Sequence, residues 1–421
     1  MRNYSFLYAS FKPFVNWACR LFYRNLHVRD SHQVSKKDTP IILISNHQNA
    51  LLDPLLCCIT SPEQLNFLTR ADVFKNPTAK KLLFQLNMLP VYRAHDRVNI
   101  KESNAPTFRE SLNRLEKNQI MSLFPEGTHE RSQNLMPFKK GAARIICDLL
   151  SAGYKSEVII QPVGLHYTNI IHSGYPCFVK YGTQVQISAA DLDLTEENRA
   201  KTILELTKKM NILLSKYVIH FPHGNEYYRQ LFVFRVLQWS NLFSAEESSI
   251  PKFKELENLV PQHMPKVLNF TEKELKEIEY SSFDSAALVL AADSKLKKRF
   301  SIKLLALLPI YFIGFISTFI PYNLGKILSK KLVKDIHFTS TAKIVSGFLM
   351  IPVFWALSFI ILSVFLPLLW CVLITLIMII TGSLFLKYHT SYRILARANS
   401  LRNNSRFKPL ITKTKEILAI A

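Results

Sequence analysis

The spacing of hydrophobic positions changes along the chain, and each change predicts a different kind of structure. Residues 5–27 repeat apolar side chains at helical intervals, with Lys12, Arg20 and Arg24 between them. Such a basic amphipathic helix lies either in a membrane interface or against a folded core, and the pattern supports both interpretations. We assign it to an N-terminal segment, residues 1–39. Its apolar positions are Phe11, Phe14, Val15, Ala18, Leu21 and Phe22.

From Pro40 onward, short apolar runs alternate with helical stretches. One helix is predicted at Ala105–Lys117, where Phe108, Leu112 and Leu115 share a side. Strands that alternate with helices predict an α/β domain, a mixed sheet flanked by helices, over residues 40–240. The predicted strands are Ile41–Ser45, Ile120–Phe124, Val158–Val163 and Phe178–Tyr181.

Residues 241–300 have a different character. They are rich in charge and helical in pattern, and prolines interrupt them at positions 251, 261 and 265. Proline in a helix interior removes a backbone donor and ends or kinks the helix. We expect a helical connector here, without a chemical role.

The C-terminal third contains an uncharged run that is too long for one helix of a soluble core. No Asp, Glu, Lys or Arg occurs in the 43 residues between Lys343 and Lys387. Because about 20 apolar residues cross the hydrocarbon core as a helix, this length predicts a helical hairpin over residues 344–386, turning near Pro367. The sequence therefore predicts an integral membrane protein.

A second apolar run, Leu304–Ile320, has 17 residues and basic flanks on both sides. Basic flanks prefer the cytosolic side, and a crossing here would export the lysine-rich segment that precedes Ile344. We therefore expect a re-entrant or interfacial segment at 304–320, inside a membrane region of residues 301–390. A basic tail follows at 391–421. The α/β domain and both chain ends then face the cytosol.

The charge balance narrows the choice of partner. The chain has 53 Lys and Arg against 31 Asp and Glu, a formal net charge of +22, which indicates an anionic partner. The basic residues cluster beside the apolar segments, at 295–343 and 387–415, and this favours an anionic lipid membrane over nucleic acid. The six cysteines form no C-x-x-C pair, which predicts free thiols in a reducing compartment.

The first candidate for chemistry is the segment Ser45–Pro54, which directly follows an apolar strand and contains His47 and Asp53. A neutral imidazole can take a proton from a hydroxyl, while a carboxylate holds the other ring N–H. Residues six apart in one regular helix point about 240° apart, so a turn must separate the two if they are to meet. The pair is a candidate acid/base dyad, and a surface loop is the alternative.

The second candidate is the segment Leu123–Arg131, followed by Pro137–Gly141. Here an apolar strand runs into a turn with a carboxylate, a hydroxyl and an arginine, and two lysines lie beyond it. Gly127 permits close backbone approach, and cations suit a phosphate or a similar anion. Two further segments are weaker: Arg93 leaves a strand-like stretch and suits a phosphate, and Pro162 suits a pocket wall.

In their order and spacing, the four segments resemble those of the glycerolipid acyltransferases, the family of glycerol-3-phosphate and lysophosphatidate acyltransferases. The resemblance covers about residues 40–190, and Phe-Pro-Glu-Gly at 124–127 is its most specific part. It implies that His47 deprotonates the acceptor hydroxyl as that hydroxyl attacks an acyl thioester, and that Asp53 orients His47. It also implies that an acceptor-binding group of residues holds the substrate and that Pro162 belongs to the acyl-donor side. The acceptor-binding group comprises Arg93, Glu126, Gly127, Thr128, Arg131 and Lys139.

One difference from the common family pattern affects which acceptor we expect. The common family pattern has four residues between His and Asp, whereas this sequence has five. A branch that resembles the fungal glycerol-3-phosphate/dihydroxyacetone-phosphate acyltransferases also has five, and carries a triplet like His129-Glu130-Arg131. The resemblance thus favours an unacylated acceptor and leaves 1-acylglycerol 3-phosphate open.

The expected function is therefore transfer of a fatty acyl group from acyl-CoA or acyl carrier protein to a hydroxyl of a glycerol-phosphate acceptor. An acyl thioester is already activated, so no cofactor is expected beyond that co-substrate. The histidines His47, His95, His129 and His166 match no metal-ligand spacing, and no metal site is expected. The competing hypothesis is an inactive membrane scaffold with an acyltransferase-like domain.

Overall fold

The computed structural model describes residues 5–34, 38–93, 96, 98–244, 253–280, 285–332 and 339–419. By its internal contacts the chain divides into two compact units. The first comprises the segments up to Arg20, Leu26–Ile170 and Cys177–Val218, and the second comprises Leu21–Asn25, Ile171–Pro176 and Ile219–Ala421. The predicted domain boundary at residue 240 therefore falls inside the second unit.

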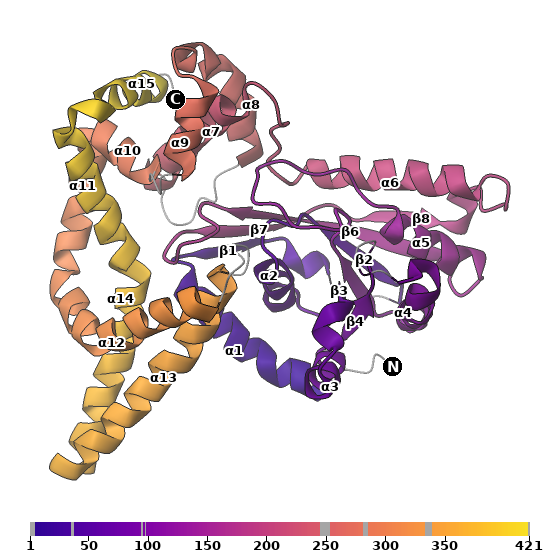
Figure 1. The fold of residues 1–421 in the computed structure, drawn as a ribbon, viewed down its shortest axis with the longest axis horizontal. Coiled ribbons are helices and arrows are strands. Elements are labelled where there is room, and N and C mark those ends of the chain that lie inside the picture. The colour runs from indigo at the N-terminus through magenta and orange to yellow at the C-terminus, as the bar shows by residue number, and fades with distance from the viewer. Residues whose placement is uncertain are drawn as a thin grey trace. The chain divides into compact units, whose positions relative to one another are not determined.

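One twisted, mixed sheet forms the centre of the first unit (Figure 1). Its strand order is β1-β7-β6-β2-β5-β3-β4, and β8 pairs with β6. The pairs β2–β5, β2–β6, β3–β5 and β3–β4 are parallel, whereas β6 runs antiparallel to β7 and β8. The strands are β1 Leu26–Arg29, β2 Ile41–Ser45, β3 Leu65–Arg70, β4 Met88–Val91, β5 Ile120–Leu123, β6 Glu157–Tyr167, β7 Cys177–Tyr181 and β8 Val185–Ser188.

Helices cover both faces of this sheet, which confirms the predicted α/β class. All four apolar residues of β2 from Ile41 to Ile44 are fully buried, as expected for a strand with both faces covered. Ile42 and Ile44 lie in one core cluster with buried residues of α5 and α6. The helices are α1 Phe6–Phe22, α2 Leu52–Thr60, α3 Pro77–Gln85, α4 Ile100–Glu116, α5 Gly141–Ser151 and α6 Arg199–Ser215, with 3₁₀ turns at Ser31–Gln33, Ala71–Phe74 and Ala189–Asp191.

The sequence left two interpretations of the N-terminal helix open, and α1 has features of both. Its buried Tyr8 accepts a hydrogen bond from the Leu65 backbone at 3.2 Å, and Lys12 donates to the Ser61 carbonyl, so one face packs on the α/β core. Phe6 and Phe14, in contrast, are 86% and 58% exposed. The helix is thus anchored to the sheet unit while it presents aromatic side chains to its surroundings.

The second unit is helical and has a core of its own. Helix α10 is buried along its length, from Ala286 to Ala292, and packs against α7, α14 and α15. The predicted connector and the predicted basic tail both contribute to this core, because their apolar faces need a partner. Its helices are α7 Tyr227–Ser244, α8 Phe253–His263, α9 Glu272–Tyr280, α10 Ser285–Ala292, α11 Ser294–Ala306, α12 Leu308–Leu332, α13 Thr339–Phe365, α14 Leu368–Asn403 and α15 Lys408–Leu418, with 3₁₀ turns at Met264–Val267 and Ser405–Phe407.

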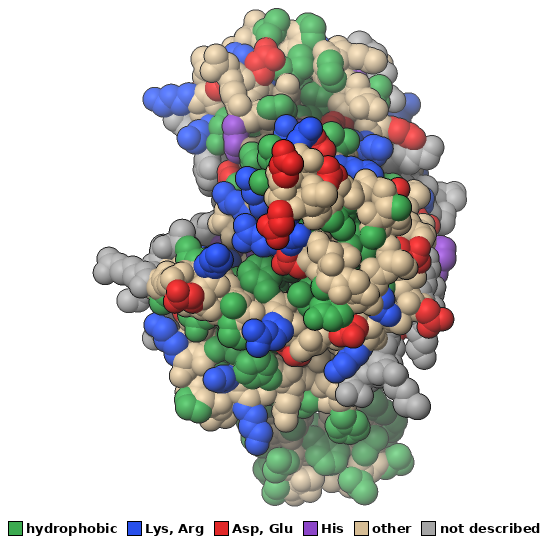
Figure 2. Space-filling model, turned by 90° about the vertical axis from the view of Figure 1, so that its right-hand side faces the viewer, with side chains coloured by type: hydrophobic (Ala, Val, Ile, Leu, Met, Phe, Trp, Pro, Cys, Tyr) green, Lys and Arg blue, Asp and Glu red, His purple; other side chains and the backbone are tan. Residues whose placement is uncertain are grey.

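Among the described residues, three helices are long and apolar enough to cross a membrane. Helix α13 ends at Phe365 and α14 begins at Leu368, so the chain turns at Pro367. Hydrophobic side chains cover this end of the pair, at the bottom of Figure 2. Phe365, Leu368 and Leu369 there are 67–77% exposed, as expected for a surface that faces lipid.

The third helix, α12, contains residues 308–320 of the segment predicted to be re-entrant or interfacial, whereas residues 304–306 end α11. Helix α12 is continuous from Leu308 to Leu332 and has no internal turn. Tyr311 and Tyr322, about 16 Å apart along its axis, both contact Phe385 and His389 of α14. Helix α12 therefore crosses α14 obliquely and does not run alongside it.

Candidate active site

The candidate catalytic and substrate-binding residues follow the ends of parallel strands in the sheet. His47 follows β2, the 124–131 turn follows β5, and Arg93 follows β4. Because these strands are parallel, their carboxyl ends lie at one edge of the sheet. Strands β2 and β5 are neighbours, whereas β3 separates β5 from β4. The arrangement brings the first two segments together and places Arg93 about 10 Å along the edge.

His47 and Asp53 meet as a hydrogen-bonded pair. His47 Nδ1 lies 2.8 Å from Asp53 Oδ2, and both residues are buried. Asp53 lies in the first turn of α2, and the intervening loop supplies the turn that the sequence requires. A carboxylate only accepts, so Nδ1 carries the proton and Nε2 is the basic nitrogen of the ring.

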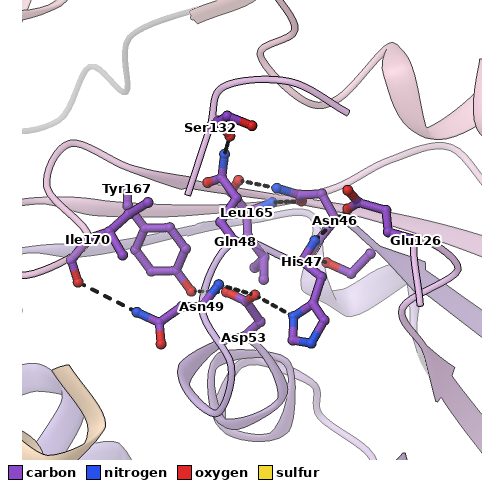
Figure 3. A network of polar contacts seen from close by, with 11 residues as sticks. Asn46, His47, Gln48, Asn49, Asp53, Glu126, Ser132, Leu165, Tyr167 and Ile170 are labelled. Atoms are coloured by element: carbon purple, nitrogen blue, oxygen red, sulfur yellow. Dashed lines mark hydrogen bonds and ion pairs between the residues drawn. The ribbon is translucent and has the colours of Figure 1, made fainter. Parts of the chain in front are cut away.

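The Asp53 carboxylate accepts two further hydrogen bonds (Figure 3). The Asn49 backbone N–H donates to Oδ2 at 2.7 Å, and the Tyr167 hydroxyl donates to Oδ1. Asp53 is fully buried, so these donors replace the water that a charged carboxylate would otherwise bind. Tyr167, at the end of β6, was not predicted, because nothing near it in the sequence points to His47.

Polar side chains on either side of His47 attach its loop to other elements (Figure 3). Asn46 donates to the Leu165 carbonyl at 2.9 Å and accepts from the Leu165 N–H at 2.8 Å, a two-bond link to β6. Gln48 donates to the Ser132 carbonyl at 2.7 Å. The loop is thus held by side-chain bonds that the His/Asp pattern does not predict.

The imidazole of His47 also has an aromatic neighbourhood. Phe124 stacks on it with ring centroids 4.4 Å apart, and His129 approaches edge-on at 5.4 Å. Both side chains come from the turn after β5. The predicted triplet at 129–131 therefore begins with a residue in contact with the candidate base.

The carboxylate of Glu126 is buried beneath this turn. Its Oε1 accepts the His47 backbone N–H at 2.6 Å, and its Oε2 accepts the Met136 N–H at 3.1 Å. Burial raises the pKa of Glu126 to about 7, against the smaller, lowering effect of these two hydrogen bonds.

Gly127 has a conformation that few other residues could adopt. Its φ is +72°, and a Cβ atom there would lie 3.0 Å from Cγ of Lys139. Lys139 donates its backbone N–H to the Pro125 carbonyl at 2.7 Å. The side chains of Thr128 and Lys139 are exposed, and Arg131 is half-buried on the same turn.

Arg93 follows β4 and Pro162 lies on β6, and these strands lie to either side of β2 and β5, which precede His47 and the 124–131 turn. Arg93 is half-buried, and its pKa is lowered mainly by burial and then by the nearby cation Arg70, which ends β3. Arg70 was not predicted, since nothing in its local sequence distinguishes it. Pro162 lies opposite Ile44 of β2, in the gap between the residues of β6 that pair with β8 and those that pair with β7. A proline is accommodated there because no ladder N–H is required.

Comparison with known proteins finds similarity over the part of the chain that holds the candidate site. An acyltransferase family model matches residues 25–166. A chloroplastic 1-acyl-sn-glycerol-3-phosphate acyltransferase of Brassica napus is 25% identical over 46% of this chain and 52% of its own length, and one of Arabidopsis thaliana is 24% identical over 36% and 38%. The chain thus spans about half the length, or less, of these curated relatives.

Among solved structures, the 1-acyl-sn-glycerophosphate acyltransferase of Thermotoga maritima matches at 21% identity and a TM-score of 0.36. The match covers 49% of this chain and 78% of that one. The matched family region contains His47, Asp53, Arg93, the 124–131 turn and Pro162. Residues 25–166, which hold the His47–Asp53 pair, therefore match the acyltransferase family model.

Proposed function

We propose that this protein transfers a fatty acyl group from a thioester donor, acyl-CoA or acyl carrier protein, to a hydroxyl of a glycerol-phosphate acceptor. The observation that carries the proposal is the 2.8 Å contact between His47 Nδ1 and Asp53 Oδ2. It leaves Nε2 of His47 as the base for the acceptor hydroxyl. An inactive scaffold would have no need for a buried dyad with three donors on its carboxylate.

In the proposed reaction His47 Nε2 takes the hydroxyl proton while the oxygen attacks the thioester carbon. Asp53 stabilises the imidazolium that forms. A C–O bond forms, the C–S bond breaks, and the proton passes from His47 to the departing thiolate. The reaction needs orientation and one proton transfer, and the thioester supplies the activation, so we propose no further cofactor.

For the acceptor, we propose cationic recognition of its phosphate. Arg93, Arg131 and Lys139 are the candidate phosphate ligands, and Gly127 and Thr128 on the exposed turn are the candidates for close backbone and hydroxyl contacts. Pro162, beside β2 on β6, is the candidate for the acyl-donor side.

The identity of the acceptor rests on two indications that differ. The named relatives are 1-acyl-sn-glycerol-3-phosphate acyltransferases, which supports 1-acylglycerol 3-phosphate. The five-residue spacing and the His129-Glu130-Arg131 triplet support glycerol 3-phosphate or dihydroxyacetone phosphate. We propose 1-acylglycerol 3-phosphate as the acceptor, because whole-domain similarity rests on many more positions than one spacing and one triplet.

We also propose that the protein is integral to an anionic membrane, with the catalytic domain on the cytosolic side. The apolar helices α13 and α14 support insertion, and the basic residues of α11 and the end of α14 support contact with anionic headgroups. Both the acyl donor chain and the acylated product partition into lipid, so such a location suits the reaction.

The test is acyl transfer by the purified full-length protein. Labelled palmitoyl-CoA and palmitoyl carrier protein would each be offered with 1-acylglycerol 3-phosphate, glycerol 3-phosphate and dihydroxyacetone phosphate. We expect transfer that falls by about 10²–10⁴-fold in His47→Ala, the loss expected for a missing general base. His32→Ala, which removes an exposed histidine outside the site, is the matched control.

Transfer to one acceptor names the substrate. Absence of transfer to all three acceptors from both donors, by protein shown to be folded, would contradict the proposal and favour the inactive scaffold.

A further inference from the structure

The main chain of His47 is hydrogen-bonded on both sides by the turn that follows β5. Its N–H donates to Glu126 Oε1 at 2.6 Å, and its carbonyl accepts from the Glu130 N–H at 3.0 Å. Together with the Asp53 bond to the ring, these contacts hold both the peptide and the side chain of the base. The rings of Phe124 and His129 also contact the imidazole, so four of the five contacts described for His47 come from the turn at 124–130.

Glu126 makes this attachment with a carboxylate that faces the protein interior. Its second oxygen accepts the Met136 N–H at 3.1 Å, and the residue is only 3% exposed. The carboxylate thus bridges two main-chain N–H donors. The first, of His47, lies 79 residues from Glu126 in sequence, and the second, of Met136, lies 10 residues from it. Neither oxygen is directed to the exposed surface of the turn, where Gly127 and Thr128 lie.

The charge of the acceptor also argues against direct contact between Glu126 and the acceptor. A glycerol-phosphate acceptor is an anion, and a second negative charge close to it costs electrostatic energy in a site of reduced dielectric. The exposed cations of the same segment, such as Lys139, are better suited to bind that acceptor. A buried carboxylate is better used where its partners are N–H donors.

We infer, on the basis of the proposed acyl transfer, that Glu126 is a positioning residue that holds the His47 peptide and is not a ligand of the acceptor. Without this bond the His47 N–H loses its partner and the loop between β2 and α2 can shift. Displacement of the base by about 1 Å is enough to slow a reaction by about 10²-fold. Glu126 therefore acts on the rate of the chemical step through His47.

The first experiment separates rate from binding. In Glu126→Gln, an isosteric change, the amide can accept one of the two N–H bonds and opposes the other with its own donor. We expect kcat to fall by about 10- to 100-fold, while KM for the acceptor stays within about twofold. Glu126→Asp, whose shorter side chain reaches one donor only, should behave alike. Glu102→Gln, the same change on an exposed residue of α4, should leave both constants unchanged.

The second experiment shows whether Glu126 acts through His47. In the His47→Ala background, Glu126→Gln should cause no further loss of the residual activity, because there is no base left to position. An acceptor ligand, or a residue needed only for folding, would lower that residual activity again. Circular dichroism of each variant in detergent would establish that it is folded.

The outcomes distinguish this inference from the proposed function. If Glu126→Gln and Glu126→Asp raise KM for the acceptor at unchanged kcat, or if the effects of the two sites multiply, the positioning role is wrong and acyl transfer stands. If His47→Ala keeps full activity, the proposed function itself fails.

Discussion

At the scale of single residues, His47 shows how a base is held by groups from distant parts of the chain. Asp53 orients the ring, and Tyr167 on β6 in turn donates to Asp53 across 114 residues of sequence. Each donor to this buried carboxylate lowers the cost of keeping it charged. The orientation of the base therefore depends on residues that never touch it.

Tyr167→Phe removes the hydroxyl donor and keeps the ring. A hydrogen bond to a charged group is worth about 1.5–3 kcal/mol, so we expect a loss of stability in that range and roughly a tenfold fall in kcat. Acceptor KM should stay unchanged. Thermal unfolding and steady-state transfer would measure both, with Tyr154→Phe, an exposed tyrosine, as the control. Wild-type kcat in Tyr167→Phe would show that Asp53 does not need this donor.

Glu126 predicts a pH dependence of stability. Burial raises its pKa to about 7 from an ordinary 4.5, so the folded protein retains a proton that the unfolded chain has lost between these values. The proton retained by Glu126 stabilises the folded state. Its contribution to the free energy of unfolding is present in full below pH 4.5 and is lost as the pH rises through 7. The difference between the folded and unfolded pKa of Glu126 corresponds to a change of about 3 kcal/mol in the free energy of unfolding.

The test compares wild type with Glu126→Gln between pH 5 and pH 8. The stability of the wild type relative to the variant should decrease over this interval, measured as the difference in Tm in detergent. Parallel Tm curves for the two proteins would mean that Glu126 has an ordinary pKa.

At the scale of elements, the turn after β5 combines support of His47 with an exposed outer surface. Its inner side presents Phe124 and Glu126 to the base, and its outer side presents Thr128. Gly127 makes the change of direction possible with its positive φ. One short segment thus serves both positioning and, in our proposal, acceptor contact.

Gly127→Ala should damage this turn. A left-handed conformation costs a residue with a Cβ about 1–2 kcal/mol, and here the new Cβ also meets Lys139 at 3.0 Å. We expect lower stability and at least a tenfold loss of kcat/KM. Gly153→Ala is a matched control, because Gly153 has a φ of +69° and open space around its Cβ position. It should lose stability to a similar extent but retain its activity when folded; equal activity of the two variants would contradict the prediction.

At the scale of the whole molecule, the two units differ in secondary structure and in the features that they contain. The sheet unit holds the candidate site, and the helical unit holds the apolar helices α12, α13 and α14. Helix α12 crosses α14 obliquely, with Tyr311 and Tyr322 both on Phe385 and His389. By length and composition α12 is one of the three helices that could cross a membrane, and its interfacial or re-entrant position is our prediction from the basic flanks.

Cysteine labelling in intact cells would test this topology. In a background without native cysteines, we expect Lys331→Cys, in the last turn of α12, to be protected from a membrane-impermeant maleimide added outside. Leu366→Cys, at the turn between α13 and α14, should be labelled from outside as the matched control. Labelling at position 331 would show that α12 crosses the membrane and that the lysine-rich segment is exported.

The sequence predicted those features that rest on local periodicity or on short-range spacing. The α/β class, the strands at 41–45 and 177–181 within one residue, and the need for a turn between His47 and Asp53 all follow from patterns a few residues long. The strand-like stretch before Arg93 is β4. The short strands β1, β3 and β8 were missed, because four to six residues with partial burial carry little periodic signal.

The tertiary structure alone decided what those local patterns could not contain. The bonds from Glu126 to the His47 peptide and from Tyr167 to Asp53 join segments 79 and 114 residues apart. The burial of α10 and of the C-terminal helix α15 in one helical core is likewise non-local. Such contacts depend on which strand ends and helix faces the fold brings together, and no repeat within one segment records them. The chain itself determines the domain class, the candidate dyad and the long apolar segments, and the packing of distant segments determines how the base is held.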